Sequence, residues 1–320
     1  MTEASTARIY GLHVAVVAVL FALNFLLPDY HHGLFARILV LATFAMGYNL
    51  LFGYAGLLSL GHAMFFAAGL YGSGLAITYL GLGVLSAFVT GLGCGAVLAL
   101  VVGVLALRTS GVAFMIVTMM FAQAFVLTIV YFNQWTGGDQ GLVLQQASRI
   151  LTIGGASLDL TSPVVRYLAA LLLFAVVLFA TLAIVRSRFG RVLVAIRENE
   201  ERTRMLGYDT FANKLAAVVL SGIFCAAAGA AYALLFGYVG SNFASVQYSI
   251  LPLLWVLAGG AATTLGPLVG TVFIYYVTDI ASSYTSAWLL IVGTALVLLV
   301  LFAPKGILGA VRRRWTGWLP

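Results

Sequence analysis

Long apolar runs that carry almost no charge recur along the whole of this 320-residue chain. Hydrophobic residues make up 63% of the sequence and charged residues 8%, whereas a soluble fold covers its surface with roughly 25% charged residues. A water-soluble fold is therefore excluded. Because a bilayer crossing takes about 20 residues, the apolar content is sufficient for about ten crossings.

Charges, prolines and glycine clusters divide the chain into ten apolar segments. Their continuous Leu, Val and Ala content predicts helices, because a β-barrel shows alternating segments of roughly ten residues. The segments are residues 11–27, 34–52, 57–80, 84–107, 112–132, 164–185, 215–237, 249–259, 265–282 and 287–302. The eighth is too short to cross alone, so it either extends before residue 249 or is a broken or re-entrant piece. We predict an all-α integral membrane protein, a polytopic helical bundle with about ten transmembrane helices.

A short internal similarity leaves the symmetry of this bundle open. Residues 59–61 read Ser-Leu-Gly and residues 264–266 read Thr-Leu-Gly, and each triplet follows a glycine-containing turn. Duplicated halves with broken or re-entrant segments are common in transporters. Three residues fit an undivided bundle equally well.

The positions of the basic residues predict the orientation. If the N-terminus lies inside and ten crossings alternate, 13 of the 16 Lys and Arg residues face the cytoplasm, as the positive-inside rule requires. Arg37, Arg149 and Arg166 are the three on the outside. We expect one transmembrane domain over residues 1–320 in a bacterial cytoplasmic (inner) membrane, with both termini cytoplasmic. This placement explains the net charge of +7 without nucleic-acid binding.

Three polar segments lie between or after these spans. Residues 133–163 are predicted to form an outer, periplasmic loop, and residues 303–320 a basic cytoplasmic tail. Residues 186–214 are predicted to form a cytoplasmic loop whose centre, residues 192–206, contains neither Gly nor Pro. Because Glu200 and Arg204 have the favourable i,i+4 spacing there, we predict one short cytoplasmic helix.

Polar side chains inside apolar spans are expensive in hydrocarbon and mark either interhelical hydrogen bonds or a pathway. Asn49, Ser59 and His62 cluster around the glycine-containing turn at residues 53–56, and Gln123 lies in the fifth span. Irregular backbone at membrane depth is tolerated only where it is buried or lines a cavity. Both interpretations remain open for each residue.

Several classes of chemistry have no support in the sequence. The two lysines, Lys214 and Lys305, do not follow glycine, so the chain has no GxxxxGK[ST] nucleotide-binding loop. Metal-ligand and hydrolase motifs are absent, and two cysteines provide no disulfide framework. Asp279 is the one carboxylate inside a span, which argues against ion coupling. We therefore expect a transport protein that is not an enzyme, needs no cofactor and receives energy from a partner.

Five motifs in consistent order resemble those of one transporter family. Residues 56–66 read GLLSLGHAMFF, residues 136–142 read TGGDQGL and residues 304–309 read PKGILG. Further similarity lies in residues 190–230, and in residues 259–267, which read GGAATTLGP. The chain resembles the permease subunits of branched-chain amino acid ABC importers. It departs from their pattern at residues 261–263 and at Ala303, and relatives with the same motifs carry urea, short amides or aromatic acids.

The resemblance implies a set of partners and two functional regions. The partners would be a second, homologous permease subunit in a heterodimer, two cytoplasmic ATPase subunits, a periplasmic substrate-binding protein and membrane lipid. The expected translocation path includes Asn49, Ser59, His62, Phe65 and Gln123. The expected ATPase-coupling residues are Arg191, Leu193, Ile196, Arg197, Glu198, Arg202 and Leu206. A stand-alone ion-coupled carrier is the alternative from another class.

Overall fold

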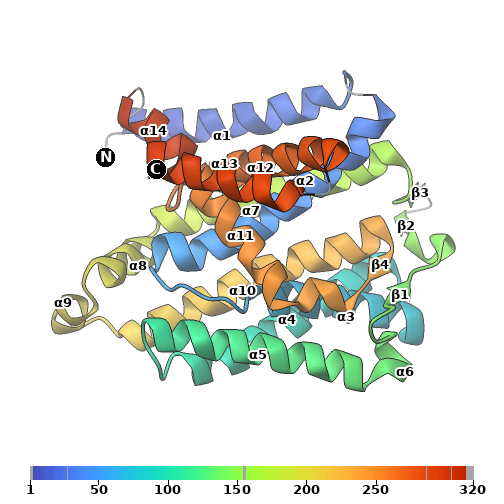
Figure 1. Cartoon of the computed structure of the whole chain (residues 1–320), viewed down its shortest axis with the longest axis horizontal. Coiled ribbons are helices and arrows are strands. Elements are labelled where there is room, and N and C mark those ends of the chain that lie inside the picture. The colour runs from blue at the N-terminus through green and yellow to red at the C-terminus, as the bar shows by residue number, and fades with distance from the viewer. Residues whose placement is uncertain (1–2, 27, 154–155, 286, 304, 315–320) are drawn as a thin grey trace.

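The computed structural model describes all residues except 1–2, 27, 154–155, 286, 304 and 315–320. A helix lies at each of the ten apolar segments, which confirms that they are helical. These helices are α1 (Glu3–Leu23), α2 (Asp29–Asn49), α3 (His62–Leu80), α4 (Val84–Ala106), α5 (Val112–Tyr131), α7 (Pro163–Arg186), α10 (Thr210–Phe236), α11 (Val246–Gly259), α12 (Gly266–Tyr284) and α13 (Trp288–Phe302). They lie side by side in a bundle (Figure 1).

Six spans in the described part of the chain are long and apolar enough to cross a membrane. They are His31–Tyr54, His62–Leu80, Val84–Ala106, Val112–Tyr131, Pro163–Arg186 and Thr210–Phe236. Shorter apolar stretches lie in α1, α11 and α13. The described chain is thus mostly helical with membrane-length spans, and the predicted count of about ten crossings is not confirmed. Of the two alternatives for the eighth segment, the structure shows the extension before residue 249, because α11 begins at Val246.

Two interruptions divide the bundle at points where the sequence contains glycine turns. The first break, residues 50–61, begins with a π-helical turn, Leu50–Tyr54, and continues as irregular backbone up to α3. The second break, residues 260–265, separates α11 from α12. Each break ends where a new helix begins, at His62 and at Gly266.

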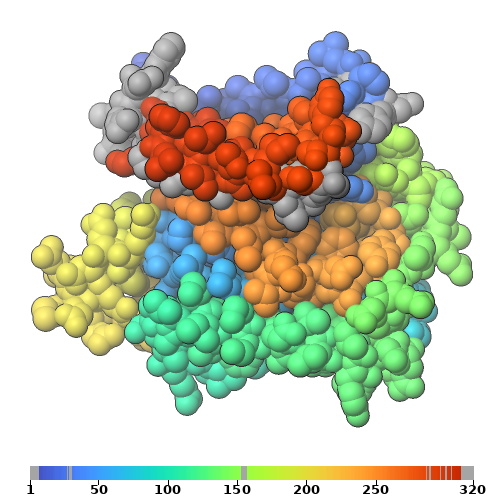
Figure 2. Space-filling view, viewed as in Figure 1, coloured from blue at the N-terminus to red at the C-terminus, as the bar shows by residue number. Residues whose placement is uncertain are grey.

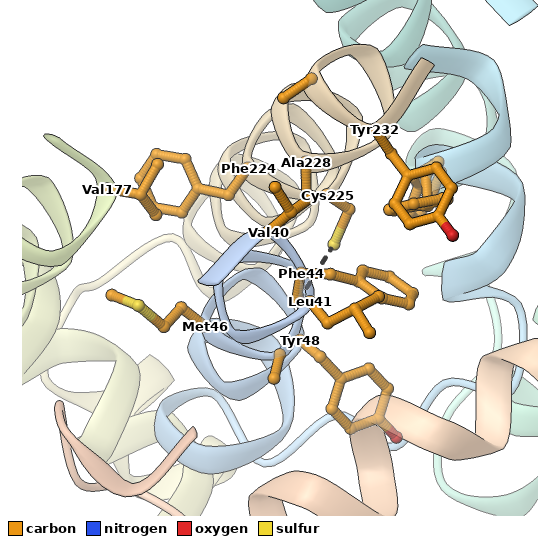
Figure 3. Close-up of a cluster of buried hydrophobic side chains, with 14 of the residues drawn as sticks. Val40, Leu41, Phe44, Met46, Tyr48, Val177, Phe224, Cys225, Ala228 and Tyr232 are labelled. Carbon is orange, nitrogen blue, oxygen red and sulfur yellow. Dashed lines mark hydrogen bonds between the residues drawn. The ribbon is translucent and has the colours of Figure 1, made fainter. Parts of the chain in front are cut away.

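Three helices form the centre of the bundle. In the most apolar stretch of each span, 83% of the residues are buried in the spans of α2 and α10 and 72% in that of α3. The corresponding shares are only 28% in α4 and 22% in α5. Helix α10 packs against α2, α3 and α4. In the close-up of this core, Val40 and Phe44 of α2 lie beside Cys225 of α10 (Figure 3). The Cys225 thiol donates a hydrogen bond of 3.8 Å to the Phe44 carbonyl.

Small residues allow α4 to approach α10 closely. A Cβ atom added at Gly95 would lie 2.1 Å from the Ala226 methyl group, and one added at Gly222 would lie 2.4 Å from that of Ala99. Such contacts are shorter than any van der Waals separation, so larger residues at these positions would force the helices apart. The small-residue face of α4 is therefore used for packing inside the chain.

One end of the bundle carries the only strands that the structure describes, and these short strands are an addition to the predicted helical bundle. The elements in residues 133–159 are α6 (Asn133–Thr136), β1 (Leu142–Val143), η2 (Gln146–Arg149), β2 (Ile150–Ile153) and β3 (Ala156–Asp159). β1 pairs with β4 (Tyr238–Val239), just before η3 (Ser241–Ala244), and β2 pairs with β3. The sequence here has no helical period, so backbone groups pair between strands instead.

The opposite end carries three short helices, α8 (Arg188–Glu198), α9 (Glu200–Met205) and α14 (Gly306–Arg314). Figure 1 shows them on the left with the start of α1, whereas the strands lie on the right. Helices α8 and α9 protrude from the body of the molecule (Figure 2). Residues 304 and 315–320 of the predicted basic tail lie outside the described residues.

Candidate functional site

Most of the first break is buried or half-buried, and its conformation depends on glycine. Gly56 has φ +73°, a left-handed value that L side chains rarely adopt. An added Cβ would also lie 2.7 Å from Cγ of Arg197 in α8. The first break therefore lies directly against the end of α8.

Asn49 joins the first break to the second. Its Nδ2 donates to the Thr263 carbonyl at 2.9 Å, and its Oδ1 accepts from the Ala262 N–H at 3.0 Å. The side chain is 1% exposed. Ala262 has a left-handed φ of 57°, which is strained for a non-glycine residue. Asn49 therefore satisfies the backbone of the second break at its most strained residue.

His62 and Ser59 fasten the other end of the first break. Nε2 of His62 lies 2.9 Å from Oγ of Ser221, whose hydroxyl donates to the Gly47 carbonyl at 2.6 Å. Since the single hydroxyl proton is used there, the His62 ring donates through Nε2–H. Oγ of Ser59 accepts from the Gly61 N–H at 3.2 Å.

The start of α3 is packed as well as hydrogen-bonded. Phe65 is 2% exposed and meets the His62 ring edge-on, with centroids 5.3 Å apart. The Ala63 N–H, which has no partner within its own helix, donates to Oγ of Ser249 in α11 at 2.9 Å. Residues from α2, α3, α10 and α11 thus meet at one buried point.

The structure brings four of the five predicted path residues together. Asn49, Ser59, His62 and Phe65 lie in or beside the first break and are buried. Gln123 lies apart from them, on an exposed face of α5. The sequence analysis missed the partners Ser221, Ser249 and Thr263, because side chains 150 or more residues away can be matched only in the fold.

The predicted cytoplasmic helix at residues 192–206 is two helices. Asn199 has extended backbone, with φ −160° and ψ 101°, and its Oδ1 accepts from the Arg202 N–H at 2.8 Å. This N-cap starts α9 and ends α8, so the single-helix prediction was wrong. Asn is a preferred N-cap residue, which is the sequence signal that was overlooked.

The coupling residues fall into two groups. Leu193 is fully buried and Ile196 is 5% exposed, so both pack against this chain. Arg197 donates to the Gly53 carbonyl in the first break. The other members are exposed to solvent, namely Arg191, Glu198, Arg202 and Leu206.

Exposed apolar side chains follow α9. Met205 is 85% exposed, Leu206 72%, Tyr208 49% and Phe211 43%. We call these four residues the α9 patch. Leu206 is the one member of the α9 patch among the predicted coupling residues.

Ion pairing holds α9 against α10. Glu200 accepts from Nζ of Lys214 at 2.6 Å and pairs with Arg204 at 3.4 Å. Partial burial raises the pKa of Glu200, but the hydrogen bond and the positive charge of Lys214 outweigh this effect, so the pKa is lowered overall. Glu200 is therefore ionised at neutral pH.

Comparison with known protein families identifies the chain. A family described as "Branched-chain amino acid transport system / permease component" matches residues 31–301. The chain belongs to this family. It therefore belongs to a family of membrane transport components, which agrees with the apolar helices of the bundle.

Curated relatives extend this result to named proteins. The chain is 28% identical to the high-affinity branched-chain amino acid transport system permease protein LivM of Salmonella typhimurium and to that of Escherichia coli. In both comparisons, 83% of this chain and 67% of the relative are covered. A probable LivM protein of Methanocaldococcus jannaschii is 27% identical over 38% of this chain and 39% of its own length. No solved structure matches.

Proposed function

We propose that this chain is a permease subunit of an ATP-binding-cassette importer for branched-chain amino acids. It would form half of the translocation path with a second, homologous permease subunit. Two cytoplasmic ATPase subunits and a periplasmic binding protein would complete the complex. The family match over residues 31–301 and the LivM relatives support this proposal. ATP hydrolysis takes place in the partners, and this chain carries out no covalent chemistry.

The α9 patch is the observation that supports a cytoplasmic partner. Four large apolar side chains exposed on a protruding, otherwise charged segment are unfavourable in water. A protein surface that covers them removes this penalty. In this proposal the ATPase subunit binds Met205, Leu206 and Tyr208, while Arg191, Glu198 and Arg202 orient the contact.

A mechanical route leads from this contact to the membrane interior. Leu193 and Ile196 fix α8 to the bundle, and Arg197 fixes it to the Gly53 carbonyl. When ATP binding moves the docked α9, α8 would pull on the first break and change the position of His62. The buried cluster of Asn49, Ser59, His62 and Phe65 would then be the moving wall of the path. Gln123, which lies apart on an exposed face of α5, is not part of this wall.

The orientation follows from the same contact. Helix α14 and the start of α1 lie at the same end of the bundle as α8 and α9 (Figure 1). In this proposal that end is cytoplasmic and both termini lie inside. Residues 133–163, at the other end, would face the periplasm and the binding protein.

Reconstitution tests the proposed function. The chain is purified with its partner permease and ATPase subunits and placed in proteoliposomes. We expect leucine uptake that requires internal ATP and external binding protein. Uptake by this chain alone, driven by a sodium or proton gradient, would contradict the proposal. So would a complete complex that hydrolyses ATP but accumulates no branched-chain amino acid.

A further inference from the structure

The three arginines that depart from the positive-inside pattern meet at one place. Cζ of Arg37 in α2 lies 5.2 Å from the centre of the Phe236 ring, and Cζ of Arg166 in α7 lies 5.5 Å from it. Arg149 is held against the same end of α10 by a hydrogen bond of 3.5 Å to the Leu235 carbonyl. Like charges repel, so gathering three cations here requires a compensating interaction.

The described residues supply little negative charge at this place. The charge of Asp159 acts on Arg149 and Arg166 there, but Asp159 forms no ion pair within the described chain. Its oxygens accept from the N–H and hydroxyl of Thr161 at 2.8 and 2.7 Å. Both ion pairs that the structure describes involve Glu200, at the other end of the bundle. The arginine cluster therefore keeps a net positive charge.

Each of the three arginines has only one hydrogen bond among the described residues. A guanidinium group has five N–H donors, and the described residues offer Arg37 one hydrogen bond, of 3.4 Å, to the Tyr275 hydroxyl. Nε of Arg166 is buried and has no hydrogen-bond partner among the described residues. Donors of both arginines are thus left for an acceptor that the described residues do not provide.

Arg37 lies too far inside its span to be an ordinary surface arginine. It lies six residues inside the span His31–Tyr54, which is about 9 Å along the helix. Its side chain is nevertheless exposed in this chain. An exposed cation at such a depth faces water, a partner or the lipid headgroups, since hydrocarbon would not solvate it.

We infer that Arg37 and Arg166 form a carboxylate-binding site at the outer end of the path. The site would hold the α-carboxylate of the amino acid after its release from the binding protein. Two guanidinium groups beside one aromatic ring suit a small anion with an apolar side chain. This inference rests on the function proposed above, and it adds where the substrate's charge is held.

The first test separates this site from a surface that docks the binding protein. Arg37→Gln, Arg37→Lys and the matched control Arg108→Gln, an exposed arginine at the end of α4, are assembled into the complete complex in proteoliposomes. Leucine uptake and ATP hydrolysis stimulated by loaded binding protein are measured in each sample. We expect Arg37→Gln to lower uptake about 10- to 100-fold, as for the loss of a charged hydrogen bond. ATPase stimulation should persist, Arg37→Lys should retain more uptake, and Arg108→Gln should behave as wild type.

The second test measures the carboxylate directly. Binding of 4-methylpentanoate and of 4-methylpentanamide to the detergent-purified complex is followed by saturation-transfer NMR. We expect the acid to bind the wild type and to lose affinity in Arg37→Gln, and the amide not to bind. Equal binding of acid and amide, or no binding of the acid to the wild type, overturns the inference.

The outcomes distinguish the inference from the proposed function. Wild-type complex that fails to import leucine refutes the function. Wild-type uptake that Arg37→Gln leaves unchanged refutes the carboxylate site alone. If uptake and ATPase stimulation fall together in Arg37→Gln, Arg37 contacts the binding protein and the inference is likewise overturned.

Discussion

The first break and the α9 patch each place side chains in surroundings that do not solvate them. Asn49, Ser59 and His62 are polar side chains buried in the centre of the bundle, at most 1% exposed. Met205 and Leu206 are apolar side chains, 85% and 72% exposed, on a segment that protrudes beyond the bundle. Both arrangements are unfavourable unless a partner compensates for them.

The source of that compensation differs between the two regions. In the first break it comes from this chain, because Asn49 and His62 bond to groups on other helices. In the α9 patch the described residues do not supply it. The buried polar side chains of the first break therefore stabilise this chain's own fold, whereas the exposed apolar side chains of the α9 patch indicate an external partner. Substitutions in the two regions should accordingly have different consequences.

Among substitutions that leave the protein folded, the largest effect is expected from Asn49→Ala. The change leaves the Ala262 N–H and the Thr263 carbonyl buried without their side-chain partner, at a cost of about 1–3 kcal/mol each. We expect a destabilisation of about 2–6 kcal/mol, measured as a fall in the unfolding temperature of the purified protein. Asn213→Ala is the matched control, since Asn213 is an exposed asparagine that bonds to the backbone of Asp209. Equal unfolding temperatures in both variants would contradict the account of the first break.

A pair of leucine substitutions separates internal packing from docking. Leu193→Asp places a charge in a fully buried position and should prevent folding, whereas Leu206→Asp alters a side chain that is 72% exposed. We expect Leu206→Asp to fold normally but to weaken ATPase-subunit binding by about 2 kcal/mol, as for an interface hot spot. Size-exclusion chromatography and co-purification measure the two properties. Retained ATPase binding in a folded Leu206→Asp protein would exclude the α9 patch as the docking surface.

Hydropathy was sufficient to predict the membrane helices but not the boundary between α8 and α9. Each apolar segment became a helix, because twenty apolar residues in lipid have few other ways to satisfy their backbone. The break after α8 was missed, since the charge pairs at residues 198–204 favour a continuous helix locally. Asn199 instead caps a new helix, and this choice depends on the packing of Leu193 and Ile196 against the bundle.

The candidate site was predictable in part. Asn49, Ser59 and His62 attracted attention because polar residues are rare in such spans, and the structure places them together. Their partners could not be predicted, because Ser221 and Thr263 become neighbours only through tertiary packing. For the same reason, the sequence could not divide the apolar residues of α8 and α9 into buried and exposed groups.

Arg197→Gln probes the link between the two regions with a smaller effect. The loss of one charged hydrogen bond to the Gly53 carbonyl should cost about 1–2 kcal/mol. We expect ATPase subunits to bind and hydrolyse ATP normally, while leucine uptake per ATP falls several-fold. Arg188→Gln, which changes an exposed arginine of the same helix, is the control. An unchanged ratio of uptake to hydrolysis would show that α8 transmits motion without this bond.

The smallest effect is expected from the pairing of Glu200 with Lys214. The folded protein lowers the pKa of Glu200 from its ordinary value of 4.5, so its stabilising effect is complete above that value. It is lost as the pH falls through the lower, folded pKa. Because the Glu200 side chain is 33% exposed, we expect about 0.5–1 kcal/mol. Unfolding temperatures of wild type and Glu200→Gln should differ at pH 7 and converge below pH 4. A constant difference across this range would show that Glu200 acts through packing, since only its charge responds to pH.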